Sequence, residues 1–109
     1  AISLGGAPVP PYYYWSLGVP YLMTGQYEKA IAALKKAISL WPEYLGGHLS
    51  LTAAYSLAGR MEESRAQAAE VIKINPKLTL EDIVKDGYYG FPKAGKERFV
   101  NALHKAGLT

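Results

Sequence analysis

The 109-residue chain contains no cysteine, and residues 1–27 include no charged side chain. The absence of cysteine excludes disulfide bonds, thiolate metal sites and cysteine nucleophiles. A chain without disulfides fits the reducing cytoplasm, which is the location that we expect. Because every charged residue lies beyond Tyr27, the N-terminal part of the chain differs in chemistry from the rest.

Long apolar runs and clusters of basic residues are also missing. No uninterrupted apolar stretch approaches the roughly 20 residues that a membrane-spanning helix needs, and prolines and glycines interrupt the uncharged residues 1–27. The net charge is +3, with the lysines scattered among glutamates, whereas a nucleic-acid-binding surface carries a basic stripe. Hydrophobic residues make up 50% of the chain, as in small folded domains. We therefore expect one folded domain that binds neither a membrane nor a nucleic acid.

The sequence does contain an internal repeat with a constant period. Two segments with a proline at the same position, KKAISLWPEY and AEVIKINPKL, resemble each other. Four pairs of identical residues stand at one and the same spacing: Leu17 and Leu51, Tyr21 and Tyr55, Gly25 and Gly59, Pro42 and Pro76. Matches at one spacing indicate two copies of one structural unit.

Each unit is predicted to form two helices. In the first unit, Gly25 separates the two helices and Pro42 follows the end of the second helix, since glycine and proline mark helix ends. Pro20 lies inside the first helix, where proline removes a backbone hydrogen bond, so we expect a kink or a late helix start. In the second helix, apolar residues recur at the spacing of a buried face: Tyr27, Ala30, Ile31, Leu34, Ala37 and Ile38. The four predicted helices span residues 11–24, 26–40, 45–57 and 61–74.

The pattern resembles the tetratricopeptide repeat, whose signature is W-x-x-L-G-x-x-Y, then A-x-x-x-F, then P. The first unit matches it with Tyr14, Leu17, Gly18, Tyr21, Ala30, Leu34 and Pro42. The second unit matches it more weakly, with His48, Leu51, Thr52, Tyr55, Ser64, Ala68 and Pro76. The resemblance implies an all-α fold, a tetratricopeptide array of helical hairpins.

The resemblance also divides the chain. It gives two repeats, at residues 11–44 and 45–78, followed by a half-repeat and a C-terminal capping helix at 79–109. Residues 1–10 form a linker or the stub of a preceding repeat, because AISL at the start of the chain echoes AISL at 37–40. Thr79 to Asp82 reads as a capping box, and the final helix, roughly residues 93–106, should present three apolar residues on one face: Phe99, Val100 and Leu103.

The tail is similar to something narrower, the C-terminal tetratricopeptide regions of bacterial adenylate/guanylate cyclase-like signalling proteins. That resemblance implies a regulatory part of a larger signalling protein, whose cyclase or regulatory domain lies upstream of this chain. The matching residues are Glu97, Arg98, Ala102, Leu103, Lys105, Ala106, Gly107 and Leu108.

One short stretch has the spacing of a phosphate-binding loop, G-x-x-x-x-G-K, in Gly90, Gly95 and Lys96. A working loop needs a preceding strand and a following Ser or Thr, whereas the preceding residues read as helix and turn, and Glu97 follows. The two histidines, His48 and His104, lack a recognisable catalytic or metal-binding context. We therefore expect no catalytic residue, metal or cofactor, and no enzyme activity in these residues. A small nucleotide-binding domain at 90–97 is the alternative from the enzyme class.

A protein-binding surface is expected on the first helix of each repeat. Successive helical side chains turn by about 100°, so four consecutive aromatic residues at 12–15 cannot all face the core. The family's groove positions fall on Tyr12, Trp15, Val19, Leu22, Leu49, Ala53 and Ser56. The Lys, Asn and Arg of the family's carboxylate-binding groove are absent there, so an apolar protein or peptide segment is the expected partner. The alternative is a homodimerisation unit, without a separate ligand, that pairs through the uncharged N-terminal face.

Overall fold

Helical hairpins make up most of the computed structural model, which describes residues 3–4, 7–8, 10–85 and 96–109. The helices are α1 (Pro11–Met23), α2 (Tyr27–Leu40), α3 (Leu45–Leu57), α4 (Met61–Ile74), α5 (Leu80–Lys85) and α6 (Lys96–Lys105). Two very short strands, β1 (Ser3–Leu4) and β2 (Ala7–Pro8), pair antiparallel.

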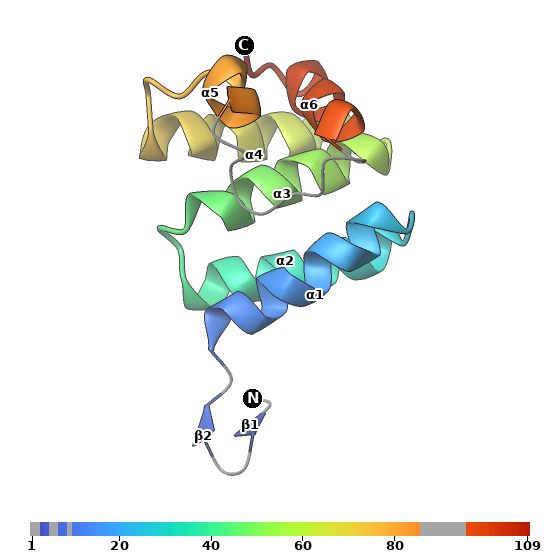
Figure 1. Ribbon diagram of the computed structural model, residues 1–109, viewed down its shortest axis with the longest axis vertical. Coiled ribbons are helices and arrows are strands. Elements are labelled where there is room, and N and C mark those ends of the chain that lie inside the picture. Colours follow the sequence, from blue (N-terminus) through green and yellow to red (C-terminus); the bar gives the residue numbers. More distant parts are fainter. Residues whose placement is uncertain (1–2, 5–6, 9, 86–95) are drawn as a thin grey trace.

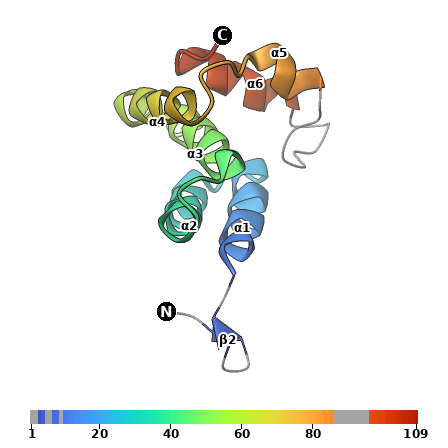
Figure 2. The ribbon, with the colours of Figure 1, turned by 90° about the vertical axis from the view of Figure 1, so that its left-hand side faces the viewer.

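The helices stack as layers along the long axis of the molecule (Figure 1). The α1–α2 hairpin forms one layer, the α3–α4 hairpin lies on it, and α5 and α6 cover the far side of the second hairpin (Figure 2). The main contacts between the two hairpins join α2 to α3. The prediction of an all-α array of helical hairpins is confirmed.

Glycines end the first helix of both repeats in the same way. Gly25 and Gly59 each have φ of +80°, a left-handed conformation that strains residues with a side chain. After each glycine the next backbone N–H reaches back over the helix end, from Gln26 to the Tyr21 carbonyl and from Arg60 to the Tyr55 carbonyl, both at 2.8 Å. These are Schellman motifs, so the period of the sequence repeat is also a period of the backbone.

The predicted apolar stripe of α2 forms the centre of the first hairpin. Four of its six members, Ala30, Ile31, Leu34 and Ala37, are buried, while Tyr27 and Ile38 are half-buried at its edges. On α1, Gly18 permits a close approach, because a Cβ atom built there would lie 2.6 Å from Leu34 Cγ. The glycine of the repeat signature is therefore a packing residue in this hairpin.

Pro20 does not delay the start of α1, which runs without a break from Pro11 to Met23. Of the two outcomes expected at Pro20, the late start was wrong, because Pro20 is exposed and its ring therefore points away from the hairpin contact, and the kink stays a prediction. The carbonyl of Pro20 is well bonded: it accepts hydrogen bonds from the Thr24 hydroxyl at 3.0 Å and the Thr24 N–H at 3.1 Å.

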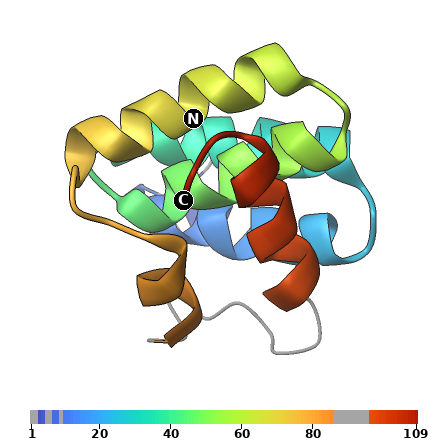
Figure 3. The same cartoon turned by 90° about the horizontal axis from the view of Figure 1, so that it is seen from above.

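The C-terminal part begins with the capping box predicted at residues 79–82. The Asp82 N–H donates to Thr79 Oγ1 and the Thr79 N–H donates to Asp82 Oδ2, both at 3.1 Å. Further along, α6 crosses α3 (Figure 3) and buries Phe99 and Leu103, as predicted, together with Ala102, while Val100 is half-buried. The chain end is tied back, because the Leu80 N–H donates to the carbonyl of Thr109 at 3.1 Å.

At the other end, the β1–β2 pair lies beyond the start of α1 and not alongside it (Figures 1 and 2). Ser3 and Leu4 form a strand, although the residues that they echo, Ser39 and Leu40, end a helix. The sequence echo is therefore not matched by local structure. Residues 90–95, which carry the glycines of the phosphate-loop spacing, lie outside the described residues.

Candidate docking site

The seven groove positions predicted from the repeat differ widely in exposure. Four of them are buried: Val19, Leu22, Leu49 and Ala53. Trp15 and Ser56 are half-buried, and Tyr12 is 60% exposed. Thus three of the seven side chains are reachable from outside the folded chain, and whether any of the seven contacts a partner stays a prediction.

The burial on α3 has a structural cause that the repeat pattern did not indicate. All residues from 46 to 55 are buried, because α1, α2, α4 and α6 all pack against this helix. Since α6 is amphipathic and supplies its apolar face to α3, a helix of the same chain already occupies a surface of the second repeat.

Trp15 is held in place by polar and aromatic contacts. Its indole N–H donates to Ser50 Oγ at 3.2 Å, which joins α1 to α3. Its ring meets that of Tyr44 edge to face, with centroids 5.7 Å apart, and Tyr44 stacks on Trp41 at 4.4 Å. We call Trp15, Trp41 and Tyr44 the aromatic cluster. Such paired rings are rigid and amphipathic, which suits them to contact a partner.

The aromatic cluster was only partly predicted. Trp15 was found because it stands in a run of aromatic residues, whereas Trp41 and Tyr44 were not singled out. The available signal was the sequence W-P-E-Y at 41–44, which places two aromatic rings around the turn between the repeats. Trp41 is 43% exposed, and burial raises the pKa of the Tyr44 hydroxyl above its ordinary value. The cluster therefore runs from the protein interior to its surface.

A concave region lies between the C-terminal end of α3 and α6. This cavity of about 400 Å³ is lined by Ser56, Leu57, Glu97, Arg98, Asn101, Ala102 and Lys105. Arg98 also reaches the first repeat, where it donates a hydrogen bond to the Tyr27 hydroxyl and lies over that ring, 5.5 Å from its centroid. The predicted groove residue Ser56 thus faces a cavity whose opposite wall is α6.

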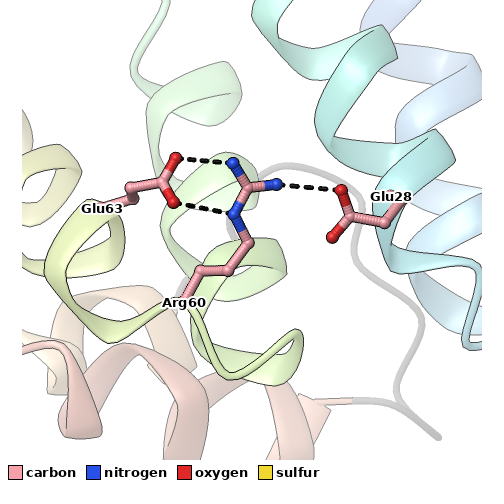
Figure 4. A network of polar contacts seen from close by, with 3 residues as sticks. All are labelled: Glu28, Arg60 and Glu63. Atoms are coloured by element: carbon pink, nitrogen blue, oxygen red, sulfur yellow. Dashed lines mark hydrogen bonds and ion pairs between the residues drawn. The ribbon is translucent and has the colours of Figure 1, made fainter.

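An arginine joins the turns of the two repeats on the surface (Figure 4). Arg60 binds Glu63 through two hydrogen bonds, of 2.8 and 2.7 Å, and binds Glu28 of the first repeat at 2.9 Å. The hydrogen bonds from Arg60 lower the pKa of the Glu63 carboxyl, and the same pairing raises the pKa of Arg60. Because the guanidinium is bound on both sides, it is a structural link between repeats.

His48 is a packing residue, as its place in the repeat signature predicted. It is buried, with Nε2 2.6 Å from the carbonyl oxygen of Pro42 and Nδ1 in contact with the side-chain amide of Gln67. Since a carbonyl only accepts, Nε2 is the donor, and Nδ1 accepts from the amide. Both ring nitrogens are occupied. In the described part of the chain, no group of three or more His, Cys, Asp or Glu residues could hold a metal ion.

Lys96, from the stretch with the phosphate-loop spacing, donates a hydrogen bond to the carbonyl of Val84 in α5. It therefore ties the start of α6 to the preceding helix. Of the helices in the described ranges, none has both the length and the apolar character to cross a bilayer.

These features define a class of protein, the helical-hairpin repeat scaffold, and the comparisons with known proteins agree. The tetratricopeptide repeat family matches residues 21–80, which is more than half of the chain, so the chain belongs to this family. Repeats of this family are non-catalytic modules that bind protein or peptide partners.

One particular relative is the Protein STIP1 homolog of Dictyostelium discoideum, which is 40% identical over 63 residues. The match covers 57% of this chain and 11% of the relative, so the chain corresponds to a small part of that protein. The comparison with solved structures gave no match.

Proposed function

We propose that the chain is a protein-docking module that binds an apolar segment of a partner protein. The partner segment lies on the α1 side of the repeats, against Tyr12 and the aromatic cluster. The observation that carries this proposal is the exposure of large rings on a rigid support: Tyr12 is 60% exposed and Trp41 is 43% exposed. Exposed aromatic residues that are fixed in position are the typical anchors of protein interfaces.

The charge of this region supports an apolar partner. α1 has no acidic residue in its first turn and no basic residue in its last turn, and no residue before Glu28 is charged. A strongly acidic segment would therefore lose water there without gaining an ion pair, since the charged residue in the turn that carries Trp41 and Tyr44 is Glu43. An aliphatic or aromatic segment loses no such interaction.

The experiment is a selection of random short peptides displayed on phage, followed by calorimetric titration of the recovered peptides. We expect apolar peptides, and we expect Tyr12→Ala to weaken their binding about tenfold or more, as for interface hot spots. Tyr12 is exposed, so this variant should fold normally. Lys36→Ala, on the exposed side of α2, is the matched control. Recovery of highly charged peptides, or equal binding by Tyr12→Ala and the control, would contradict the proposal.

We further propose that this module serves a bacterial signalling protein of the adenylate/guanylate cyclase-like kind, in the cytoplasm. The support is the resemblance of the tail alone, at Glu97, Arg98, Ala102, Leu103, Lys105, Ala106, Gly107 and Leu108, with His104 in place of the usual basic residue. The reading frame upstream of residue 1 tests this part, because a cyclase or regulatory domain is expected there. A different upstream sequence would remove the signalling context and leave the docking proposal untouched.

A further inference from the structure

The turns that follow α2 and α4 have the same backbone hydrogen bond and different side chains. In the first turn the Tyr44 N–H donates to the carbonyl of Trp41 at 3.1 Å. In the second turn the Leu78 N–H donates to the carbonyl of Asn75 at 3.1 Å. The first turn reads W-P-E-Y and the second reads N-P-K-L. Because the second turn forms without an aromatic or an acidic residue, the backbone of the first turn does not require Trp41 or Glu43.

Trp41 presents one free face of a large ring. Tyr44 covers the other face, with ring centroids 4.4 Å apart and ring planes 12° from parallel. Since 43% of Trp41 is nevertheless exposed, the exposed part includes the face opposite Tyr44. The face of an aromatic ring attracts cations, and tryptophan attracts them most strongly.

Other rings of this chain already hold a cation in this way. The three pairs are Lys29 over Tyr21 at 5.8 Å, Arg60 over Tyr55 at 5.1 Å and Arg98 over Tyr27 at 5.5 Å. Among the described residues, no Lys or Arg lies over Trp41. Trp41 is therefore an exposed tryptophan whose free face has no cation from its own chain in these ranges.

Glu43 adds a negative charge to the same turn. It is exposed and forms no ion pair with a described residue, including Lys35 and Lys36, the nearest basic residues along the chain. α1 and α3, the helices next to the aromatic cluster, contain no Asp, Glu, Lys or Arg. The ends of a four-residue turn lie within about 7 Å of each other. One long basic side chain can therefore meet both Trp41 and Glu43.

We propose that Trp41 and Glu43 form a binding site for one basic side chain, Lys or Arg, of the partner segment. The cation lies over the face of Trp41 opposite Tyr44 and pairs with Glu43, while the apolar rest of the segment contacts Tyr12 and Trp15. This inference rests on the proposed docking function and specifies its ligand as an apolar segment with a single positive charge. An acidic residue at the same place would be repelled by Glu43.

The first test uses the peptides that are recovered by selection on the whole chain. We expect each peptide to contain one Lys or Arg among apolar residues. Replacing Lys by norleucine, or Arg by citrulline, removes the charge and keeps the size, and should weaken binding about five- to tenfold. Trp41→Leu and Glu43→Gln should each abolish most of this difference. Glu62→Gln, which changes an exposed acid of α4, is the matched control and should preserve it.

A reversal of charge sharpens the test. Glu43→Lys should bind a peptide with Glu in place of the basic residue more tightly than it binds the original peptide. Two results would overturn the inference: apolar peptides without a preferred basic residue, or an equal effect of charge removal on the wild type, Trp41→Leu and Glu43→Gln. In either case a weakening of the same peptides by Tyr12→Ala would leave the docking proposal intact.

A small probe tests the site by itself, even where selection recovers no apolar peptide and the docking proposal fails. Nα-acetyl-arginine amide at millimolar concentration should shift the indole N–H signal of Trp41 in the NMR spectrum, a signal that Trp41→Leu identifies by its loss. The affinity should fall about threefold or more in Glu43→Gln, and the uncharged citrulline analogue should cause no shift. An unshifted Trp41 signal in the wild type would overturn the inference.

Discussion

α1 and α3 are built from the same kind of residues and yet meet different surroundings. Both are 13 residues long, and neither contains Asp, Glu, Lys or Arg. α3 is buried along residues 46–55, because helices pack on all its sides, whereas α1 leaves Tyr12 and Leu17 exposed. The comparison teaches that apolar composition shows how much of a helix can be covered. It does not show which neighbour covers it.

The largest expected difference concerns the two equivalent leucines. Leu51 is 3% exposed and Leu17 is 37% exposed. A lysine would therefore be buried at position 51 and would reach water at position 17. We expect Leu51→Lys to lower the free energy of unfolding by about 3–5 kcal/mol, and Leu17→Lys to lower it by less than about 1 kcal/mol. Urea unfolding at low protein concentration, followed by circular dichroism, measures both. Equal losses would mean that α1 is covered as completely as α3.

A smaller difference in the free energy of unfolding is expected between alanine substitutions at two glycines that lie at helix contacts. Gly18 lies within the first hairpin, where an added Cβ would meet Leu34 Cγ at 2.6 Å. Gly47 lies between the repeats, where an added Cβ would lie 3.3 Å from Ile38 Cγ1. Leu34 is fully buried and Ile38 is half-buried, so Ile38 can move more easily.

We expect Gly18→Ala to cost about 1–2 kcal/mol, which is an overpacking cost reduced by the higher helix propensity of alanine. Gly47→Ala should change the free energy of unfolding by less than about 1 kcal/mol, because its gain in helix propensity offsets a milder contact. Thermal unfolding of both variants compares them. A stabilised Gly18→Ala protein would show that Leu34 adapts freely and that α1 and α2 are loosely packed.

The smallest effect is a dependence on pH that only the second repeat should show. Arg60 and Glu63 are paired in this repeat, whereas the equivalent positions of the first repeat hold Gln26 and Lys29. The pKa of Glu63 is lowered by folding. The ionised Glu63 therefore stabilises the folded state at neutral pH, and this stabilisation is lost as the pH falls below about 4.5, the ordinary pKa of a glutamate.

We therefore expect the wild-type chain to lose more stability between about pH 7 and pH 3 than Glu63→Gln loses. Glu62→Gln, which changes an exposed neighbour, is the control and should behave as the wild type. The urea midpoints at the two pH values give the comparison. The effect is small because the pair is accessible to water, with 35% of the Arg60 side chain and 46% of the Glu63 side chain exposed.

The helices and their ends could be predicted closely from the sequence. α3 and α4 have the predicted bounds, and α1 and α2 are each one residue shorter than predicted. These features are local: Gly25 and Gly59 end a helix because of their own backbone freedom, and the Thr79–Asp82 capping box forms within one turn. The late start predicted at Pro20 was wrong, since an exposed proline is tolerated in α1.

The candidate docking site could be predicted only in part. Tyr12 and Trp15 are accessible as expected for a contact surface, but Leu22 and Leu49 are among the most deeply buried residues of the chain. The repeat pattern indicates which side of a helix faces the groove, and it does not indicate what else enters the groove. Trp41 joins the aromatic cluster through its stacking on Tyr44, which depends on the path of the turn between the repeats.

By itself, the sequence determined the two helical hairpins, their turns and the uncharged character of the N-terminal helix. These follow from residue spacing, glycine and proline positions, and composition, all of which act over short stretches of chain. Only the tertiary structure decided that α6 packs on α3 and that Tyr12 and Leu17 of α1 stay exposed. The reason is physical: burial depends on the summed contacts of segments far apart in the chain, and the same apolar residue is core or surface according to which helix reaches it.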